Sequence, residues 1–158
     1  MYQGLDMVIT KGDTKIAEEC VKIARDLPDY FTDSGIINLI QDIKNYQLFV
    51  VNDSGKMLGF IVIAAKYPQA AEILWLAVKK EHQNKGYGTA LIEHSSIGLK
   101  EKGIRLLEVK TLAPHAGYQP YEATRRFYDK NGFMLTDIID PYPGWEPGNP
   151  CALYVKIL

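Results

Sequence analysis

Three strand-like segments follow one another in the middle of the chain, joined by connections too short to contain a helix. Residues 48–51, 57–66 and 71–78 are rich in aliphatic, β-branched and aromatic side chains. Asp-Ser-Gly-Lys lies between the first two segments, and Tyr-Pro-Gln lies between the second two. A parallel crossover needs about a dozen residues or more, so strands joined this briefly must pair antiparallel. The sequence therefore predicts an antiparallel meander at the centre of the fold.

Helical patterns occupy both sides of this meander. Apolar residues recur at helical spacing over residues 14–27 and 34–44, and a short strand is predicted at 7–9. In the second half, the predicted elements are a helix at 88–102, a strand at 106–111, a helix at 121–131, and strands at 133–139 and 152–157 around a Pro/Gly-rich loop at 140–150. This order predicts an α/β fold in which a mixed sheet carries helices on both faces.

Length, charge and composition limit the classes of protein to consider. A chain of 158 residues suits a single domain, here spanning residues 1–158. Its 18 Lys and Arg residues nearly balance its 19 Asp and Glu residues, which disfavours nucleic acid or an anionic membrane as a partner. The longest apolar runs have six residues, against the roughly 18 that span a bilayer, and Asp6 argues against a signal peptide. Because Cys20 and Cys151 lack metal or redox spacing, we expect reduced thiols, a cytoplasmic location and no metal site.

Residues 78–91 carry the strongest chemical signal in the sequence. A strand ends there, a polar loop follows, and Gly86 and Gly88 lead into a helix. The first backbone N–H groups of a helix have no partner within it and lie at the positive end of its dipole, and glycine lets an anion approach the backbone closely. Lys85 adds a positive charge beside them. The arrangement indicates a phosphate site, although a glycine-rich turn required only for packing explains the spacing equally well.

These residues resemble the GNAT superfamily of N-acetyltransferases. The strand at 71–78 and the Gln-x-x-Gly-x-Gly-Thr motif at 83–89 are similar to the cofactor strand and loop of that family. Residues 123–133 are similar to its later helix and the strand after it, and the segment around Trp145 resembles a prokaryotic subgroup whose acceptors are mostly undefined. The resemblance extends over about residues 48–138. It implies the GNAT fold, with a mostly antiparallel central sheet, one splayed parallel pair of strands and about four flanking helices.

The resemblance also implies that acetyl-CoA is the cosubstrate and that no metal takes part. In this family the glycine loop surrounds the pyrophosphate, and backbone groups at the end of the preceding strand pair with the pantetheine arm as if it were another strand. The residues at the matching positions are Leu76, Ala77, Val78, Gln83, Asn84, Lys85, Gly86, Tyr87, Gly88 and Thr89.

Two residues match the positions of catalytic groups in the family. Glu72 matches the carboxylate that takes the proton of the attacking amine, and Tyr128 matches the phenol that protonates the leaving thiolate. An ordinary surface carboxylate at a strand end is the alternative for Glu72, and a buried aromatic with a satisfied hydroxyl is the alternative for Tyr128. Strict alternation along the strand places Glu72 on the face of the other even-numbered residues, Leu74, Leu76 and Val78.

Three residues outside these blocks are candidates for contact with the acceptor. His115 lies in the loop before the last helix, which commonly faces the acceptor in this family. Tyr142 and Trp145 lie in the Pro/Gly-rich loop, which walls the acceptor pocket in several relatives. A loop folded back on itself by tryptophan packing explains the last two residues as well.

The resemblance implies an N-acetyltransferase in which a primary amine attacks acetyl-CoA directly within a ternary complex. The amine belongs either to a small molecule or to a lysine or N-terminus of a protein. A non-catalytic module that senses acyl-CoA is the alternative, but sensing requires neither Glu72 nor Tyr128. An enzyme that uses a longer acyl group fits the same sequence. A homodimer is compatible with the resemblance, and neither nucleic acid nor a membrane is expected as a partner.

Overall fold

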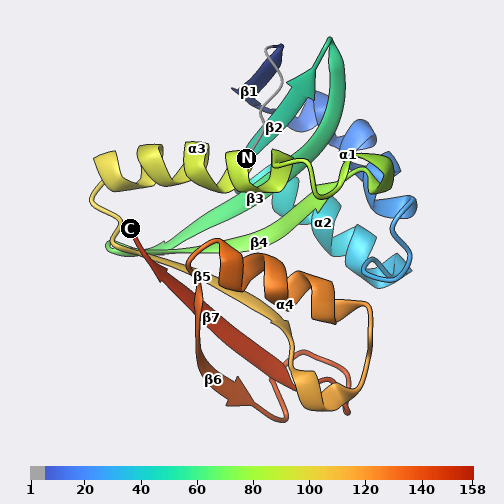
Figure 1. Ribbon diagram of the computed structural model, residues 1–158, viewed down its shortest axis with the longest axis vertical. Coiled ribbons are helices and arrows are strands. Elements are labelled where there is room, and N and C mark those ends of the chain that lie inside the picture. Colours follow the sequence, from blue (N-terminus) through green and yellow to red (C-terminus); the bar gives the residue numbers. More distant parts are fainter. Residues whose placement is uncertain (1–5) are drawn as a thin grey trace.

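The computed structural model describes residues 6–158 and arranges them as one mixed sheet with helices on both faces (Figure 1). Within these residues the sheet has seven strands in the order β1-β2-β3-β4-β5-β7-β6. The strands are β1 (Met7–Lys11), β2 (Gln47–Asp53), β3 (Lys56–Tyr67), β4 (Ala70–Val78), β5 (Leu106–Leu112), β6 (Met134–Ile139) and β7 (Cys151–Ile157). Only β4 and β5 pair in parallel among the described strands. The predicted fold class is confirmed.

The described residues form four α-helices, as predicted: α1 (Ala17–Arg25), α2 (Asp33–Asn45), α3 (Tyr87–Glu101) and α4 (Tyr121–Lys130). The first differs from its prediction, because residues 14–16 form a separate 3₁₀ turn and α1 ends at Arg25. Side chains close the starts of the first two helical segments. Asp13 Oδ1 accepts a hydrogen bond from Lys15 N at 2.9 Å, and Thr32 Oγ1 accepts one from Gly35 N at 3.1 Å.

The meander predicted at the centre of the chain is confirmed. Strands β2, β3 and β4 pair antiparallel in sequence order. Asp53 pairs with Lys56, so the β2–β3 connection is a two-residue turn, and Ser54 and Gly55 both have positive φ, 51° and 78°. Two left-handed residues give a turn whose twist matches that of the strands it joins. The local turn chemistry thus sets the register of the hairpin.

The two faces of the sheet carry separate hydrophobic cores. Helices α1 and α2 cover one face, where Leu39 and Ile43 pack with Phe60 and Val62 of β3. Helices α3 and α4 cover the opposite face, where Leu91 packs with residues of β3, β4 and β5. Figure 1 shows α3 and the α1–α2 pair on opposite sides of β3 and β4. Because β3 is buried on both faces, it has a nearly continuous apolar sequence.

A β-bulge interrupts the alternation of side chains in β4. Ile73 pairs with Ile63 and Trp75 pairs with Val62, so Leu74 is an extra residue on the β4 side. Before the bulge, Ala71 and Ile73 pack in the α3–α4 core; after it, Trp75 and Ala77 pack in the α1–α2 core. The prediction that strict alternation continues from Glu72 through Leu76 and Val78 is therefore wrong. Glu72 and Leu74 lie on the α1–α2 face, whereas Leu76 packs against the α3–α4 core.

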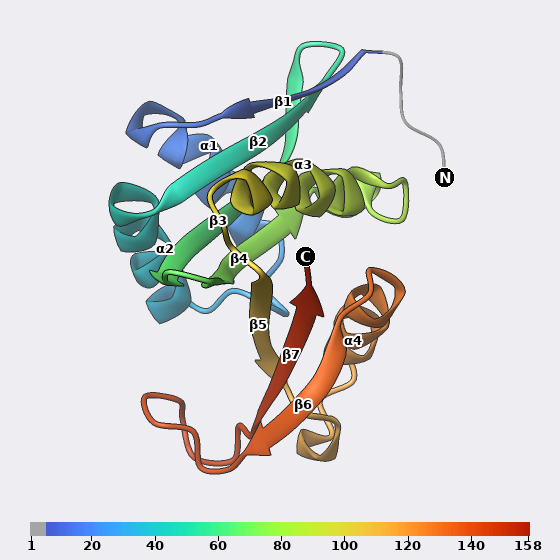
Figure 2. The ribbon, with the colours of Figure 1, turned by 90° about the vertical axis from the view of Figure 1, so that its left-hand side faces the viewer.

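The strands β4 and β5 separate at this bulge. Their parallel pairing joins residues 70–73 to residues 106–109 and extends no further within the described chain. Figure 2 shows β1–β4 and β5, β7 and β6 diverging as two parts of one sheet from this shared segment. The splayed parallel pair implied by the resemblance is confirmed.

The two parts of the sheet meet again through a cluster of tyrosines. Tyr30, in the α1–α2 connection, has its ring centroid 5.3 Å from that of Tyr121 in α4, and its hydroxyl donates to Pro120 O at 2.9 Å. The Tyr118 hydroxyl donates to Asp29 O at 2.9 Å. The neighbouring Phe31 stacks on Trp75 of β4 at 5.6 Å. The α1–α2 connection therefore links β4 to the start of α4 beyond the point where the strands separate.

Two substitutions in α2 test the packing of this helix. Leu39 is fully buried in the α1–α2 core, whereas Ile37 is exposed on the same helix. We expect Leu39→Ala to lower the free energy of unfolding by about 2–5 kcal/mol, because it removes buried methyl groups and leaves a cavity. Ile37→Ala is expected to change it by less than about 0.5 kcal/mol. Urea denaturation measures both, and equal losses in the two variants would contradict the orientation of α2.

Candidate active site

The loop between β4 and α3 presents backbone N–H groups at a helix N-terminus. Asn84 and Gly86 have positive φ, 61° and 92°, and Gln83 Nε2 donates to Val78 O at 3.0 Å, which ties the loop back to the end of β4. The first hydrogen bond of α3 runs from Ala90 N to Gly86 O at 3.0 Å. The amides of Gly88 and Thr89 precede that bond and have no acceptor within the helix. This geometry suits an anion.

Glycine is needed at the two positions of the motif for different structural reasons. Gly86 occupies the left-handed conformation, where a side chain costs about 1–2 kcal/mol. A Cβ atom on Gly88 would lie 3.0 Å from Cζ of Phe127 and 3.9 Å from Cγ2 of Val78. The ring of Phe127 thus packs directly on the first turn of α3. Packing explains Gly88, and backbone conformation explains Gly86.

The remaining residues of the loop region divide between anchoring and exposed positions. The Tyr87 hydroxyl donates to Asp53 Oδ2 at 2.7 Å, which fixes the first turn of α3 to the β2–β3 hairpin. Lys85 is exposed beside the helix N-terminus. Leu76, Ala77 and Val78 follow the bulge, and within residues 6–158 no strand pairs with the β5-facing edge of β4 beyond Ile73. Strand β4 therefore offers an open edge next to the loop.

Tyr128 lies in α4 and is only 6% exposed. Its ring centroid is 5.2 Å from those of both Phe127 and Phe133, each in an edge-on arrangement. Among the described residues its hydroxyl has no hydrogen-bond partner. Burial, and to a lesser extent the neighbouring Tyr121, raise the pKa of the Tyr128 phenol well above its usual value. The phenol therefore stays protonated at neutral pH and has its proton available to a ligand.

Thr111 of β5 is a buried polar residue that sequence reasoning missed. Its Oγ1 is buried without a hydrogen-bond partner in the described structure. Thr111 is two residues beyond Val109, the last β5 residue paired with β4, and alternation places it on the same α3–α4 face. A buried hydroxyl left unpaired costs about 1–3 kcal/mol, so this position favours a ligand that completes its hydrogen bond. A single threonine in an apolar strand carries no sequence signal for this role.

Glu72 is not a surface carboxylate, because it is only 7% exposed. Its Oε1 accepts hydrogen bonds from Lys66 Nζ at 2.9 Å and from Lys110 Nζ at 3.1 Å. Burial lowers the pKa of Lys110, but hydrogen bonds with Tyr142 and Glu72 and the charge of Glu72 outweigh it and raise this pKa above its usual value. Lys110 is therefore charged at neutral pH. The two lysines lie on β3 and β5, the strands on either side of β4, and their convergence on Glu72 was not predicted.

The loop at 140–150 folds over this charged cluster. The ring centroid of Tyr142 lies 5.5 Å from Lys110 Nζ and 5.2 Å from that of Trp145. Tyr142 therefore packs against Trp145 within the loop and also contacts Lys110 of the charged cluster. His115 is exposed, and its Nε2 lies 3.5 Å from Asp140 Oδ2 at the start of the same loop. The structure places Tyr142 at the cluster, while His115 contacts the base of the loop.

The described site has two sides. The glycine loop, Tyr128 and Thr111 belong to the α3–α4 side of the sheet. Glu72 and its lysines belong to the α1–α2 side, one residue before the last paired position of β4. Between these sides lies the segment where β4 and β5 separate. Within residues 6–158 no cluster of three or more His, Cys, Asp or Glu side chains could hold a metal ion.

Comparison with known proteins identifies the family. A family model described as an acetyltransferase (GNAT) domain matches residues 44–135, which is more than half of the chain. The chain therefore belongs to the GNAT family of acetyltransferases. A curated relative, an uncharacterized N-acetyltransferase of Chlorobaculum tepidum, is 37% identical over 75 residues, or 48% of this chain and 47% of that protein. The matched segment thus spans about half the length of that relative.

Solved structures share the fold over nearly the whole chain. A GNAT family acetyltransferase from Elizabethkingia anophelis with acetyl-CoA bound has a TM-score of 0.73 and 20% identity, covering 98% of this chain and 99% of that one. The ribosomal-protein-S18-alanine N-acetyltransferase from Escherichia coli has a TM-score of 0.75 and 22% identity, covering 96% and 93%. Across residues 6–158, no helix has the length and apolar character needed to cross a bilayer.

Two glycine substitutions within α3 test the contact with Phe127. A Cβ atom on Gly98 would meet nothing within 4 Å, whereas one on Gly88 would lie 3.0 Å from Phe127 Cζ. Alanine in place of an open helical glycine stabilises by about 0.5–1 kcal/mol, while overpacking costs about 1–3 kcal/mol. We expect Gly98→Ala to raise the free energy of unfolding, as measured with urea. The free energy of unfolding of Gly88→Ala should be lower than that of Gly98→Ala by roughly 1–3 kcal/mol. Equal stabilities would show that the ring does not pack on this turn.

Proposed function

We propose that this protein transfers an acetyl group from acetyl-CoA to a primary amine by direct attack within a ternary complex. The observation that carries this proposal is the open edge of β4, which begins at the bulge and runs directly to the glycine loop at the α3 N-terminus. A thioester with a long polar arm and a pyrophosphate matches this arrangement from end to end. Its arm would pair with the edge near Leu76 and Val78, and its pyrophosphate would meet the amides of the loop.

The residues of the loop are proposed to share the work of holding the cosubstrate. Gln83, Asn84 and Lys85 border the α3 N-terminus, and Gly86, Gly88 and Thr89 supply backbone amides. The side chain of Tyr87 holds that turn against Asp53. Thr111 Oγ1, buried and unpaired within the described chain, is placed to hydrogen-bond the part of the cosubstrate that enters between β4 and β5. The thioester would then lie beside both sides of the site.

The proposed reaction needs one proton removed and one supplied. An alkylamine has a pKa near 10.4, so its deprotonation at pH 7 costs about 4–5 kcal/mol. We assign Glu72 as the carboxylate that takes this proton through water, and the two ammonium groups beside it favour the neutral form of an incoming amine. The amine nitrogen bonds to the carbonyl carbon, the C–S bond breaks, and Tyr128 gives its proton to the departing thiolate.

An acyl-CoA sensor without turnover is the second candidate. Such a module would need the loop and the open edge but neither a buried phenol without a partner nor a buried carboxylate at the point of separation. Both groups are present at Tyr128 and Glu72, so turnover is the better explanation.

Unpaired, buried thiols at Cys20 and Cys151 support the reducing cytoplasm as the setting. Strand β6, an edge strand with Met134 and Leu135 exposed, is the surface we assign to a homodimer, which sedimentation velocity would detect.

Calorimetric titration with acetyl-CoA tests the cosubstrate site. We expect wild-type protein to bind and Gly86→Glu to lose roughly 100-fold or more in affinity, because the variant places bulk and negative charge at the α3 N-terminus. Gly103→Glu is the matched control, since Gly103 has a similar φ of 85° with open space around it at the opposite end of the helix. Failure of folded wild-type protein to bind would overturn the proposed function. Unchanged binding by Gly86→Glu would remove the loop from the site.

Paired isosteric variants test the proton path. Tyr128→Phe and Glu72→Gln each keep the shape of the side chain, and we expect each to lower kcat by about 100- to 10,000-fold while acetyl-CoA affinity stays within about twofold. Because burial raises the pKa of Tyr128 above 10.0, wild-type kcat should not fall between pH 7 and 9 through loss of this proton. Stopped assays of thiol release across this range supply the data. A kcat unchanged in either variant would remove that residue from the mechanism.

A further inference from the structure

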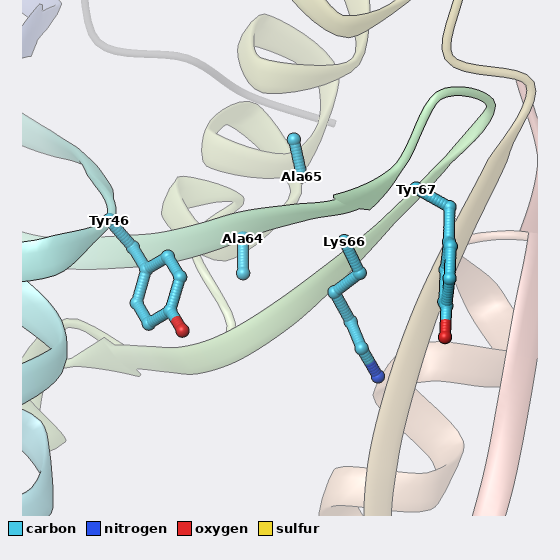
Figure 3. Close-up of a pocket in the computed structure, with 5 residues that line it drawn as sticks. All are labelled: Tyr46, Ala64, Ala65, Lys66 and Tyr67. Atoms are coloured by element: carbon cyan, nitrogen blue, oxygen red, sulfur yellow. The ribbon is translucent and has the colours of Figure 1, made fainter.

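A hollow lies beside Glu72 on the α1–α2 side of the sheet. It has a volume of about 390 Å³ and is lined by Tyr46, Ala64, Ala65, Lys66 and Tyr67. Figure 3 shows the side chains of Tyr46, Ala64, Lys66 and Tyr67 on the same side of the strands, with Ala65 pointing away. Ala64 pairs directly with Glu72, so the small alanine side chain and the carboxylate lie next to each other on this face.

The walls of this hollow are aromatic and poorly covered. Tyr46 follows the end of α2 and is 46% exposed, while Tyr67 ends β3 and is 71% exposed. The floor between them is the single methyl group of Ala64. Two exposed rings beside a small floor residue form a place for an apolar or aromatic group. A volume near the lower end of the range for ligand pockets suits a small molecule rather than a segment of folded protein.

The charges beside the hollow are mixed. Lys66 and Lys110 share one oxygen of Glu72, and their side chains are 37% and 16% exposed. Glu108 lies next to Glu72 in the parallel register and is half-buried. An ammonium group has three N–H donors, and within the described residues Lys66 uses its hydrogen bond to Glu72 alone. Lys66 lines the hollow and therefore has N–H donors left for a further carboxylate oxygen there.

This pattern selects among amine acceptors. A polycation would bring further positive charge against Lys66 and Lys110. A molecule with one ammonium and one carboxylate group complements the cluster, because its carboxylate can bind Lys66 while its amine faces Glu72 and Glu108. An aromatic or apolar side chain on the same molecule would lie between Tyr46 and Tyr67.

We propose that this hollow is the acceptor subsite and that the acceptor is a small zwitterion, an amino acid with an apolar or aromatic side chain. The inference rests on the proposed function, since it assigns the amine that the acetyl group reaches. It narrows the acceptor from any primary amine to one chemical class. Lys66 distinguishes this class from other amines by binding its carboxylate, and Tyr46 and Tyr67 shape the space for the side chain of the acceptor.

A matched pair of acceptors tests the proposal. Phenylalanine and 2-phenylethylamine differ only by the carboxylate, and thiol release with each measures kcat/KM. We expect wild-type protein to prefer phenylalanine by at least about tenfold. Lys66→Met should lower the ratio of kcat/KM for phenylalanine to kcat/KM for 2-phenylethylamine by about 10- to 100-fold, through a higher KM for phenylalanine. Taking the ratio of the two acceptors removes any effect of the variant on Glu72.

Further variants guard against indirect effects. Lys100→Met, at an exposed position in α3, is the matched control and should keep the wild-type ratio. Tyr67→Ala changes an exposed side chain, so folding is retained, and it should raise KM for phenylalanine several-fold. Calorimetry of both acceptors against protein saturated with coenzyme A gives the same comparison without turnover.

The outcomes separate this proposal from the proposed function. If acetyl-CoA binds but the protein uses or binds 2-phenylethylamine equally well as phenylalanine, with no preference between them, the zwitterion subsite is wrong while acetyl transfer stands. Equal losses for both acceptors in Lys66→Met overturn the subsite as well, and so does failure of phenylalanine to bind or react. If acetyl-CoA itself does not bind, both proposals fall.

Discussion

The extra residue at Leu74 does two things to the sheet at once. It reverses which side chains of β4 face which core, so that Ile73 supports α3 and α4 while Trp75 supports α1 and α2. It also coincides with the end of pairing to β5. A regular strand would keep one alternation of side chains along its whole length. The bulge instead leaves a polar backbone edge that runs to the N-terminus of α3, and the architecture of the site depends on that edge.

The site combines two kinds of electrostatic environment on opposite sides of one sheet. On the α3–α4 side, the positive charge is that of backbone dipoles, fixed by a helix start that needs Gly86 in a left-handed conformation. On the α1–α2 side, the charges belong to side chains, and two ammonium groups compensate the charge of the buried Glu72 carboxylate. Removing one partner of such a cluster is costly, since it leaves a charge without compensation away from water. The same pairing fixes Glu72 in one orientation at the separation of the strands.

Much of the fold followed from local sequence signals. The helices α2, α3 and α4 have apolar spacing and end signals close to where the structure places them, and the meander has turn sequences that define its hairpins. The glycine loop was also predicted from the sequence, because a helix start with this motif is a local feature. The bulge was not, since nothing in the side chain of Leu74 distinguishes it from its neighbours and the extra residue exists only relative to β3. The lysine contacts of Glu72 were missed for a similar reason, because Lys110 lies 38 residues away and meets it only through strand pairing.

The tyrosine cluster gives the separated strands a second junction. At one end, β4 and β5 are joined by backbone pairing; at the other, Tyr30 and Tyr118 tie the α1–α2 connection to the residues before α4 through contacts that span 90 and 89 residues of sequence. The segments of β4 and β5 that separate are therefore held together at two places. Contacts at both places restrict the movement of one part of the sheet relative to the other. The second junction consists of residues that touch neither the glycine loop nor the charged cluster, so substitutions there would alter both sides of the sheet together.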